Sequence, residues 1–152
     1  MTPVIARCFE KTLYHNCSKK VFEENLTVTQ YAYRESCSCT DALIQIQYNY
    51  LKAFDDKDCN YVRLLAMDFS KAFDNVKHSL VGEKLKALHL NPYLDNWYLS
   101  FLMDRKQRLK LKGFVYKWHN VNKGTTQGSV RRPHLFNLFI NDLALGIMTL
   151  PA

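Results

Sequence analysis

A chain of 152 residues with 47% apolar and 23% charged residues has the composition of one compact domain with a real core, which excludes a disordered chain. Its formal charge of +7 favours a polyanionic partner, and nucleic acid before a membrane, because no basic amphipathic helix stands out and no apolar run approaches membrane-span length. The five cysteines include no C-x-x-C pair, which argues against a zinc site and a disulfide framework, so we expect reduced thiols in an intracellular protein of the cytoplasm or nucleus.

The first third of the chain is predicted to form two helices separated by a loop. Apolar residues recur at close to helical spacing through residues 4–25, which predicts one amphipathic helix. Residues 26–39 have the pattern of a loop, and Ser38-Cys-Thr40 can cap a second helix over residues 41–56 with a broad apolar face. Asp55-Asp-Lys-Asp58 then forms a polar turn. A charged cluster between two periodic segments is usually solvated, so we assign no metal to it.

A short apolar run in the middle of the chain ends on an acid. Residues 61–67 are apolar except for Arg63, which predicts a buried strand, and Asp68 follows at its end. A carboxylate at the mouth of a buried strand is dry enough to bind a cation strongly. Alternatively, Asp68 and Asp74 merely end a strand and begin a helix, where Asp is common. Spacing alone does not decide between these interpretations.

The rest of the chain is predicted to alternate between helices and one hairpin. Residues 78–89 and 93–103 form helices separated by Asn91-Pro92, and residues 107–121 alternate as a hairpin that turns near Lys112-Gly113. A last helix covers residues 133–145, with proline in its first turn. The polar side of the hairpin is basic, which suits contact with a phosphate backbone or, alternatively, a solubilising edge that blocks strand pairing. Its cations are Arg105, Lys106, Arg108, Lys110, Lys112 and Lys117.

Three motifs resemble one known family. Asp68-Phe-Ser-Lys-Ala-Phe-Asp74 resembles the first catalytic motif of reverse transcriptases, in the form carried by non-LTR (LINE-type) retrotransposons. Gln30-Tyr-Ala-Tyr-Arg34 with Ser38-Cys-Thr-Asp-Ala-Leu43 is similar to the fingers segment of that family. Gly124-Thr-Thr-Gln-Gly-Ser-Val130 with Pro133-His-Leu-Phe-Asn-Leu-Phe-Ile-Asn-Asp-Leu143 resembles its template and nucleotide-binding motif. The motifs occur in family order, which makes chance agreement very unlikely.

The resemblance implies a role for particular residues. Asp68 would be the catalytic carboxylate and a ligand of Mg²⁺, in a cleft shared with Gln127, and Phe73 would exclude ribonucleotides by its bulk. The implied nucleotide-binding residues are Arg34, Phe69, Phe73, Gln127 and Gly128. The implied nucleic-acid contacts are Arg105, Lys106, Arg108, Lys110, Lys112, Arg131 and Arg132. The implied partners are an RNA template, a DNA primer or RNA–DNA hybrid, and a deoxynucleoside triphosphate, with no membrane.

The resemblance also implies a fold. We expect an α+β domain over residues 1–152, with residues 1–60 like the fingers and residues 61–152 like an incomplete palm, whose ferredoxin-like sheet carries helices on one face. The family pairs the strand at residues 61–67 with a hairpin bearing Ala-Asp-Asp, and no Asp-Asp of this sequence can replace that motif. Because that hairpin is missing, we expect an exposed hydrophobic edge and a need for a completing chain. The family also has further residues before the helix at residues 4–25, so we expect a cut N-terminus.

Several positions depart from the family pattern. Cys37 and Thr126 differ from the usual residues, and Arg131 and Arg132 stand where a small residue and a glycine are usual, so we expect two bulky cations to strain the turn or alter how the template lies. The leading hypothesis is a fragment of a retroelement RNA-directed DNA polymerase, inactive alone. The alternatives are a nucleic-acid-binding module without catalysis and a remnant of a decayed element with no selected role.

Overall fold

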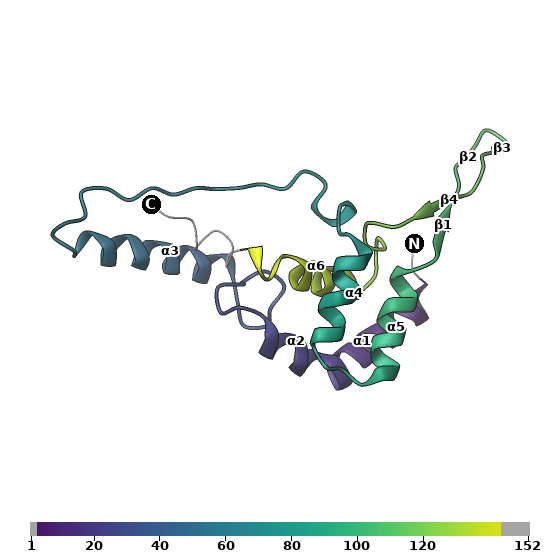
Figure 1. Ribbon diagram of the computed structural model, residues 1–152, viewed down its shortest axis with the longest axis horizontal. Helices are drawn as coiled ribbons and strands as arrows, with labels where there is room; N and C mark the ends of the chain where they lie inside the picture. The colour runs from purple at the N-terminus through teal and green to yellow at the C-terminus, as the bar shows by residue number, and fades with distance from the viewer. Residues whose placement is uncertain (1–2, 144–152) are drawn as a thin grey trace. The chain divides into compact units, whose positions relative to one another are not determined.

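The computed structural model describes residues 3–143, which form two compact units (Figure 1). Residues 3–26 and 71–143 make the larger unit, and residues 27–70 make the smaller one. This division differs from the predicted boundary after residue 60, because the N-terminal helices pack with the C-terminal half of the chain.

The larger unit is mainly helical and carries one hairpin. Its N-terminal helices are α1 (Val4–Leu13), the π-helical turn η1 (Tyr14–Ser18) and α2 (Lys19–Asn25). After the short 3₁₀ helix η2 (Ala72–Asp74) follow α4 (His78–Ala87), α5 (Pro92–Leu102) and α6 (Arg131–Ile140). The hairpin contains β1 (Arg105–Gln107), β2 (Lys110–Leu111), β3 (Phe114–Val115) and β4 (His119–Val121).

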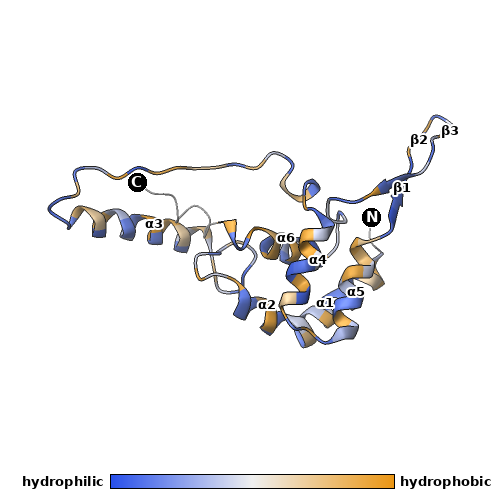
Figure 2. Ribbon diagram, viewed as in Figure 1, coloured by the Kyte–Doolittle hydropathy of each residue, from blue (hydrophilic) through white to orange (hydrophobic). Residues whose placement is uncertain are grey.

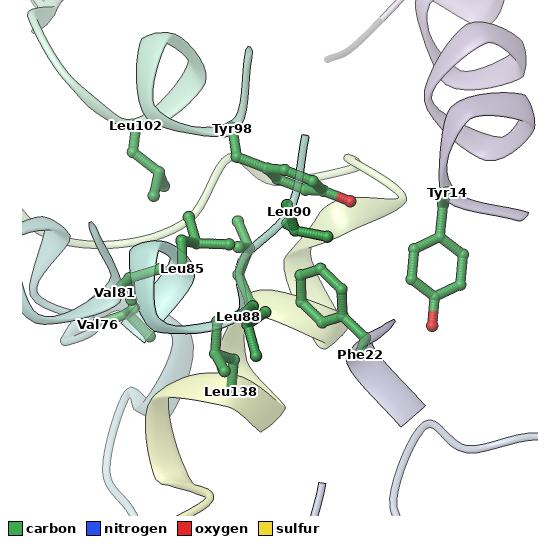
Figure 3. Close-up of a cluster of buried hydrophobic side chains, with 11 residues drawn as sticks. Tyr14, Phe22, Val76, Val81, Leu85, Leu88, Leu90, Tyr98, Leu102 and Leu138 are labelled. Atoms are coloured by element: carbon green, nitrogen blue, oxygen red, sulfur yellow. The ribbon is translucent and has the colours of Figure 1, made fainter. Parts of the chain in front are cut away.

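The core of the larger unit lies where α4 packs against α5 and α6. Val81, Leu85, Tyr98, Leu102 and Leu135 are fully buried there. Figure 3 shows these helices converging around the core, with the Phe22 side chain of α2 reaching into it. At about 1.5–3 kcal/mol for each large apolar side chain removed from water, this cluster supplies most of the unit's hydrophobic stabilisation.

The N-terminal helix lies where predicted but buries a different face. Val4, Ile5 and Phe9 are exposed, whereas Glu10, Tyr14, Ser18 and Phe22 are buried at intervals of four residues. The wide π-helical turn lets side chains four residues apart stay on one face. The buried face therefore combines aromatic rings with one carboxylate, which apolar periodicity alone does not reveal.

Glu10 makes a buried ion pair that joins α1 to the start of α6. Arg131 Nη2 lies 2.9 Å from Glu10 Oε1, and both side chains are at most 5% exposed. Glu10 Oε2 also accepts hydrogen bonds from Ser129 Oγ at 2.7 Å and from the Val130 N–H at 2.9 Å. The carboxylate thus caps the N-terminus of α6, where a negative charge is favourable.

Aromatic rings enclose the other side of this pair. The guanidinium carbon of Arg131 lies 3.8 Å from the ring centroid of Trp97 and 3.6 Å from that of Phe101, both on α5. Burial lowers the pKa of Arg131, and the hydrogen bond and charge of Glu10 oppose that shift. The expectation that Arg131 contacts nucleic acid is therefore wrong, because the side chain points into the protein and is held there.

A second aromatic contact joins the N-terminal helices to α6. The rings of Tyr14 and His134 stack with centroids 3.7 Å apart and planes 15° from parallel. Burial, with a smaller contribution from the charge of His15, lowers the pKa of His134 to about 4. His134 is therefore uncharged near neutral pH and serves as a packing ring.

The bounds of α4, α5 and the hairpin follow the sequence prediction closely. The last helix, predicted over residues 133–145, begins at Arg131 and ends at Ile140, and residues 144–145 of that prediction lie outside the described residues. The Asn91 side chain accepts a hydrogen bond from the Tyr93 N–H at 3.0 Å and caps α5, with Pro92 as its first residue. In the hairpin β1 pairs with β4 and β2 with β3, both antiparallel. Lys112 and Gly113 both have positive φ, at 46° and 86°, as a tight hairpin turn requires.

The smaller unit contains helix α3 (Cys39–Phe54) and an extended segment at residues 59–69. A capping box starts the helix: Ser38 Oγ accepts from the Asp41 N–H at 3.2 Å, and Asp41 Oδ2 accepts from the Ser38 N–H at 2.7 Å. No residue from 27 to 70 is buried, and Ile44 on α3 is 59% exposed. Figure 2 shows several hydrophobic segments, in orange, along helix α3.

The predicted buried strand at residues 61–67 is wrong for this structure. The segment forms no strand, and Leu64 and Leu65 are 64% and 75% exposed. An apolar run becomes a strand only when a neighbouring strand pairs its backbone groups, and no described residue provides one. The described chain is mixed helix and short antiparallel strand, as α+β implies, but residues 3–143 form only two-stranded ladders and not the ferredoxin-like sheet.

Because the Glu10–Arg131 pair is buried, we expect loss of its negative charge to lower the stability of the protein strongly. Glu10→Gln is expected to lower the free energy of unfolding by about 3 kcal/mol, because it leaves Arg131 buried without a counter-charge. Glu24→Gln is the matched control: Glu24 meets Lys20 at 3.8 Å on the exposed face of α2, so its loss should cost less than about 0.5 kcal/mol. Urea denaturation of the three proteins measures both values. Equal small losses would contradict a structural role for the buried pair.

Candidate nucleotide and nucleic-acid site

Two of the predicted motifs meet in the larger unit. The Thr125 N–H donates to the carbonyl oxygen of Phe73 at 3.0 Å, and the Gly124 N–H donates to that of Val76 at 2.8 Å. These bonds join residues about 50 positions apart and place the end of the first motif beside the loop at residues 124–128. We call this set of contacts the Phe73–Gly124 junction.

Gly124 is required at this junction by its backbone. Its φ is +84°, and a Cβ atom built on it would lie 3.1 Å from the carbonyl oxygen of Asp74. Its own carbonyl oxygen accepts from Arg105 Nη1 at 3.1 Å and from His78 Nε2 at 2.7 Å. A carbonyl only accepts, so the buried His78 ring carries its proton on Nε2. Burial also lowers the pKa of Arg105.

The ring of Phe73 is held on two sides. Its centroid lies 4.6 Å from that of Phe136 on α6, and the guanidinium carbon of Arg132 lies 4.5 Å from it. An Arg132 nitrogen also comes within 3.9 Å of the Asp74 carboxylate. Phe73 remains half-buried, so one part of a fixed aromatic ring faces outward beside a cation.

Gln127 and Gly128 lie on the same loop and are exposed. Gly128 has a φ of +83°, and the Ser129 N–H closes a turn on the Thr126 carbonyl oxygen at 3.3 Å. The Gln127 amide is therefore presented from a turn that is fixed at both ends, by the Phe73–Gly124 junction and by the Glu10 cap of α6. The structure thus brings together Phe73, Gln127 and Gly128 of the predicted nucleotide-binding set.

Asp68 lies in the smaller unit, and its carboxylate is exposed. The expectation of a dry carboxylate at the end of a buried strand is wrong here, because no strand forms around it. A cleft shared with Gln127 would join the two units and stays a prediction. Within residues 3–143, no group of three His, Cys, Asp or Glu side chains is placed to hold a metal ion, and the implied magnesium site stays a prediction.

The other two nucleotide-binding candidates also belong to the smaller unit. Arg34 Nη1 donates to the carbonyl oxygens of Thr27 at 3.0 Å and Gln30 at 3.4 Å, so part of its guanidinium closes its own loop. Phe69 is half-exposed in the extended segment. Nothing in either contact tests a role toward a nucleotide, and both roles stay predictions.

The basic hairpin extends beyond α5 and is coloured mainly as hydrophilic in Figure 2. Lys106, Arg108, Lys110 and Lys112 are exposed, and Arg108 stacks over Trp118 at 4.5 Å. Arg105 differs, since it is half-buried and hydrogen-bonded to Gly124. Arg131 is only 4% exposed and cannot touch a ligand at the surface. Arg132 is also half-buried. The predicted nucleic-acid contacts therefore divide into an exposed group, two half-buried residues (Arg105 and Arg132) and one residue that belongs to the core.

Sequence reasoning missed Glu10 and His78, which fix the loop carrying Gln127. A carboxylate in register with Tyr14 and Phe22 was the available signal for Glu10. His78 gave no signal, because its partner is a backbone carbonyl distant in sequence. A further missed pair is Lys84 with Asp142, whose hydrogen bond lowers the pKa of Asp142.

Each of the helices within residues 3–143 is too short or too polar to span a membrane.

The chain is similar in sequence to reverse transcriptases. A family model described as reverse transcriptase (RNA-dependent DNA polymerase) matches residues 1–149. A probable RNA-directed DNA polymerase from transposon BS of Drosophila melanogaster is 31% identical over 114 residues, covering 75% of this chain and 12% of that protein. A probable RNA-directed DNA polymerase from transposon X-element of the same organism is 27% identical over 144 residues, covering 94% of this chain and 16% of that protein.

A third similar protein comes from outside the insects. A putative COX1/OXI3 intron 2 protein of Saccharomyces cerevisiae is 27% identical over 130 residues, covering 81% of this chain and 13% of that protein. The chain thus spans less than a fifth of the length of each of these relatives.

Alanine substitutions at Gly124 and Gly113, which have similar φ, should lower the free energy of unfolding by different amounts because only Gly124 lies in the Phe73–Gly124 junction. Gly124→Ala should lower the free energy of unfolding by more than Gly113→Ala, because both pay about 1–2 kcal/mol for a left-handed backbone but only the Cβ at 124 meets Asp74. Around Gly113, whose φ is +86°, nothing lies within 4 Å of that Cβ. Denaturation in urea compares the two variants with the parent. Equal losses would mean that the close approach at Asp74 relaxes without cost.

Proposed function

Because this chain belongs to the reverse transcriptase family, we propose that its residues form the template- and nucleotide-binding portion of a retroelement RNA-directed DNA polymerase. The ligands of that portion are an RNA template, a DNA primer or RNA–DNA hybrid, and a deoxynucleoside triphosphate. Similarity to polymerases of two non-LTR transposons supports the retroelement assignment.

The observation that carries the proposal is the Phe73–Gly124 junction. A nucleotide site needs a fixed ring for the sugar and a neutral amide for the base or sugar, close together on a rigid support. Phe73 and Gln127 meet these requirements, since two backbone hydrogen bonds join their segments and the ring is packed against Phe136. Arg132, next to that ring, supplies a positive charge for a phosphate.

Magnesium is the cofactor that the family uses, and Asp68 is the residue of this chain that would hold it. In the family this aspartate is joined by two adjacent aspartates on a later hairpin, and no Asp-Asp of this sequence can replace that pair. Asp55 and Asp56 lie in an exposed polar turn, where Asp56 Oδ1 accepts from the Asp58 N–H at 3.1 Å. We therefore propose that these 152 residues bind substrates and do not by themselves supply the full set of catalytic carboxylates.

The nucleic-acid contacts proposed from the sequence are revised accordingly. Lys106, Arg108, Lys110, Lys112 and Arg132 remain, and Arg105 contributes through the part of its side chain left exposed. Contacts of this kind bind the phosphate backbone without reading its sequence.

Binding without polymerisation is the first test. Residues 1–152 should bind single-stranded nucleic acid or an RNA–DNA hybrid weakly, with an affinity that falls by a log–log slope of about 0.7–0.9 per phosphate contact as salt rises. The same protein should not extend a primer, because rate falls steeply when reacting groups are misplaced. Fluorescence anisotropy and gel-based extension measure the two properties. Template-dependent extension that Asp68→Ala abolishes would overturn the proposal.

The role of Phe73 can be tested in a polymerase that contains the complete set of catalytic residues. When residues 1–152 replace the matching segment of the X-element polymerase, the chimaera should prefer deoxynucleotides, and Phe73→Ala should raise ribonucleotide incorporation, because the ring leaves no room for a 2′-hydroxyl. Phe114→Ala is the control, since Phe114 lies exposed on the hairpin. Competition between labelled ribo- and deoxynucleotides measures the discrimination. An unchanged ratio for Phe73→Ala would remove this role.

A further inference from the structure

A basic cavity of about 860 Å³ lies in the larger unit, between the start of α4, the end of α5 and the β1–β4 ladder. Its charged lining consists of Lys77, Arg105, Lys106 and Lys123, against the single carboxylate of Asp104. Only Arg105 and Lys106 of these cations were predicted from the sequence to meet nucleic acid. The potential inside the cavity is therefore positive, which favours an anionic ligand.

Two of these lysines face each other across a backbone pairing. Lys77 and Lys123 form an isolated antiparallel bridge outside the named strands, so the two residues lie directly opposite each other on neighbouring backbone segments. Like charges directly opposite each other in such a pair are destabilising. Lys123 Nζ donates to the neutral amide oxygen of Asn75 at 3.4 Å, which does not neutralise the repulsion. A bound anion between the two ammonium groups would remove it.

The wall behind these lysines is rigid and offers further donors. His78 and Arg105 are both hydrogen-bonded to the Gly124 carbonyl oxygen, which ties the cavity to the Phe73–Gly124 junction. The Lys77 side chain does not cap α4, a helix of ten residues, and Ser79 of its first turn lines the cavity. The His78 N–H of that turn donates to the Asn122 carbonyl oxygen at 3.3 Å. The N-terminus of a helix adds to the positive potential. Asn120 and Asn122 add neutral amides that suit a sugar.

We propose that this cavity binds the phosphodiester backbone of a nucleic-acid strand through Lys77 and Lys123, with Lys106 meeting a further phosphate. The inference rests on the proposed function, because it names a site for the strand that the family binds. A strand suits the cavity better than a free triphosphate, since Arg108, Lys110 and Lys112 continue the positive charge along the hairpin, beyond the reach of a small molecule.

The test compares two variants that lose the same charge. Binding of fluorescein-labelled (dT)20 to residues 1–152 is measured by anisotropy over a series of salt concentrations. Lys77→Gln/Lys123→Gln should weaken binding about tenfold and reduce the salt slope by about 0.7–1.4, for one or two lost phosphate contacts. Lys11→Gln/Lys86→Gln removes two exposed lysines elsewhere in the larger unit and should leave the slope unchanged.

The thermal midpoint of each variant shows whether weaker binding is caused by a lost contact or by unfolding of the protein. Because Lys77→Gln/Lys123→Gln removes a repulsion, its thermal midpoint should equal or exceed that of the parent. Lys77→Arg/Lys123→Arg keeps the charge and should keep the binding. In the parent protein, acetylation of Lys77 and Lys123 by an amine-reactive reagent should slow when (dT)20 is bound, relative to acetylation of Lys11. This measurement needs no variant.

The outcomes distinguish this site from the proposed function. If the parent does not bind (dT)20 at any salt concentration, the proposed function is wrong and this site with it. If the parent binds but the Lys77/Lys123 variant behaves like the Lys11/Lys86 control, the site is wrong while the proposed function stands. If dTTP at the same total phosphate concentration protects Lys77 and Lys123 as well as (dT)20 does, the assignment to a strand is overturned in favour of a free triphosphate.

Discussion

The buried ion pair between Glu10 and Arg131 is the interaction on which the larger unit depends. Removing two charges from water is costly, and here the cost is offset by hydrogen bonds from Ser129, Val130 and Arg131 to one carboxylate and by aromatic rings on the guanidinium. Arg131 Nε and Nη1 nevertheless have no hydrogen-bond partner among residues 3–143. We interpret the pair mainly as a positional constraint, because it fixes where α6 begins relative to α1 and α5.

That constraint determines what the neighbouring residues can do. Arg132 follows Arg131 on α6, and successive helical side chains point about 100° apart. One arginine therefore enters the core while the next reaches Phe73 and Asp74 at the surface. The two cations that replace the family's small residue and glycine thus have different surroundings: Arg131 lies in a buried ion pair, and Arg132 contacts Phe73 and Asp74.

The loop at residues 124–128 is held from both sides by contacts distant in sequence. Glu10 caps the helix after it. Before it, Val76, His78 and Arg105 hold Gly124, and the Phe73 carbonyl oxygen holds the Thr125 N–H. Gln127 and Gly128 remain exposed between these anchors. An exposed amide on an anchored loop is suited to binding a ligand, because little conformational entropy is lost when the ligand arrives. Arg105 links this loop to the basic cavity, so both proposed ligand sites share one support.

The sequence by itself determined the helices, the hairpin and the family, because these depend on local patterns. Helical periodicity, the Ser38 and Asn91 caps and the Lys112-Gly113 turn act within a few residues. Tertiary structure alone decided the direction of Arg131, the burial of Glu10 and the approach of Gly124 to Asp74, since each depends on a partner far along the chain. The same reason explains the error at residues 61–67: an apolar run specifies a strand only together with a neighbour that pairs its backbone, and no described residue provides that pairing.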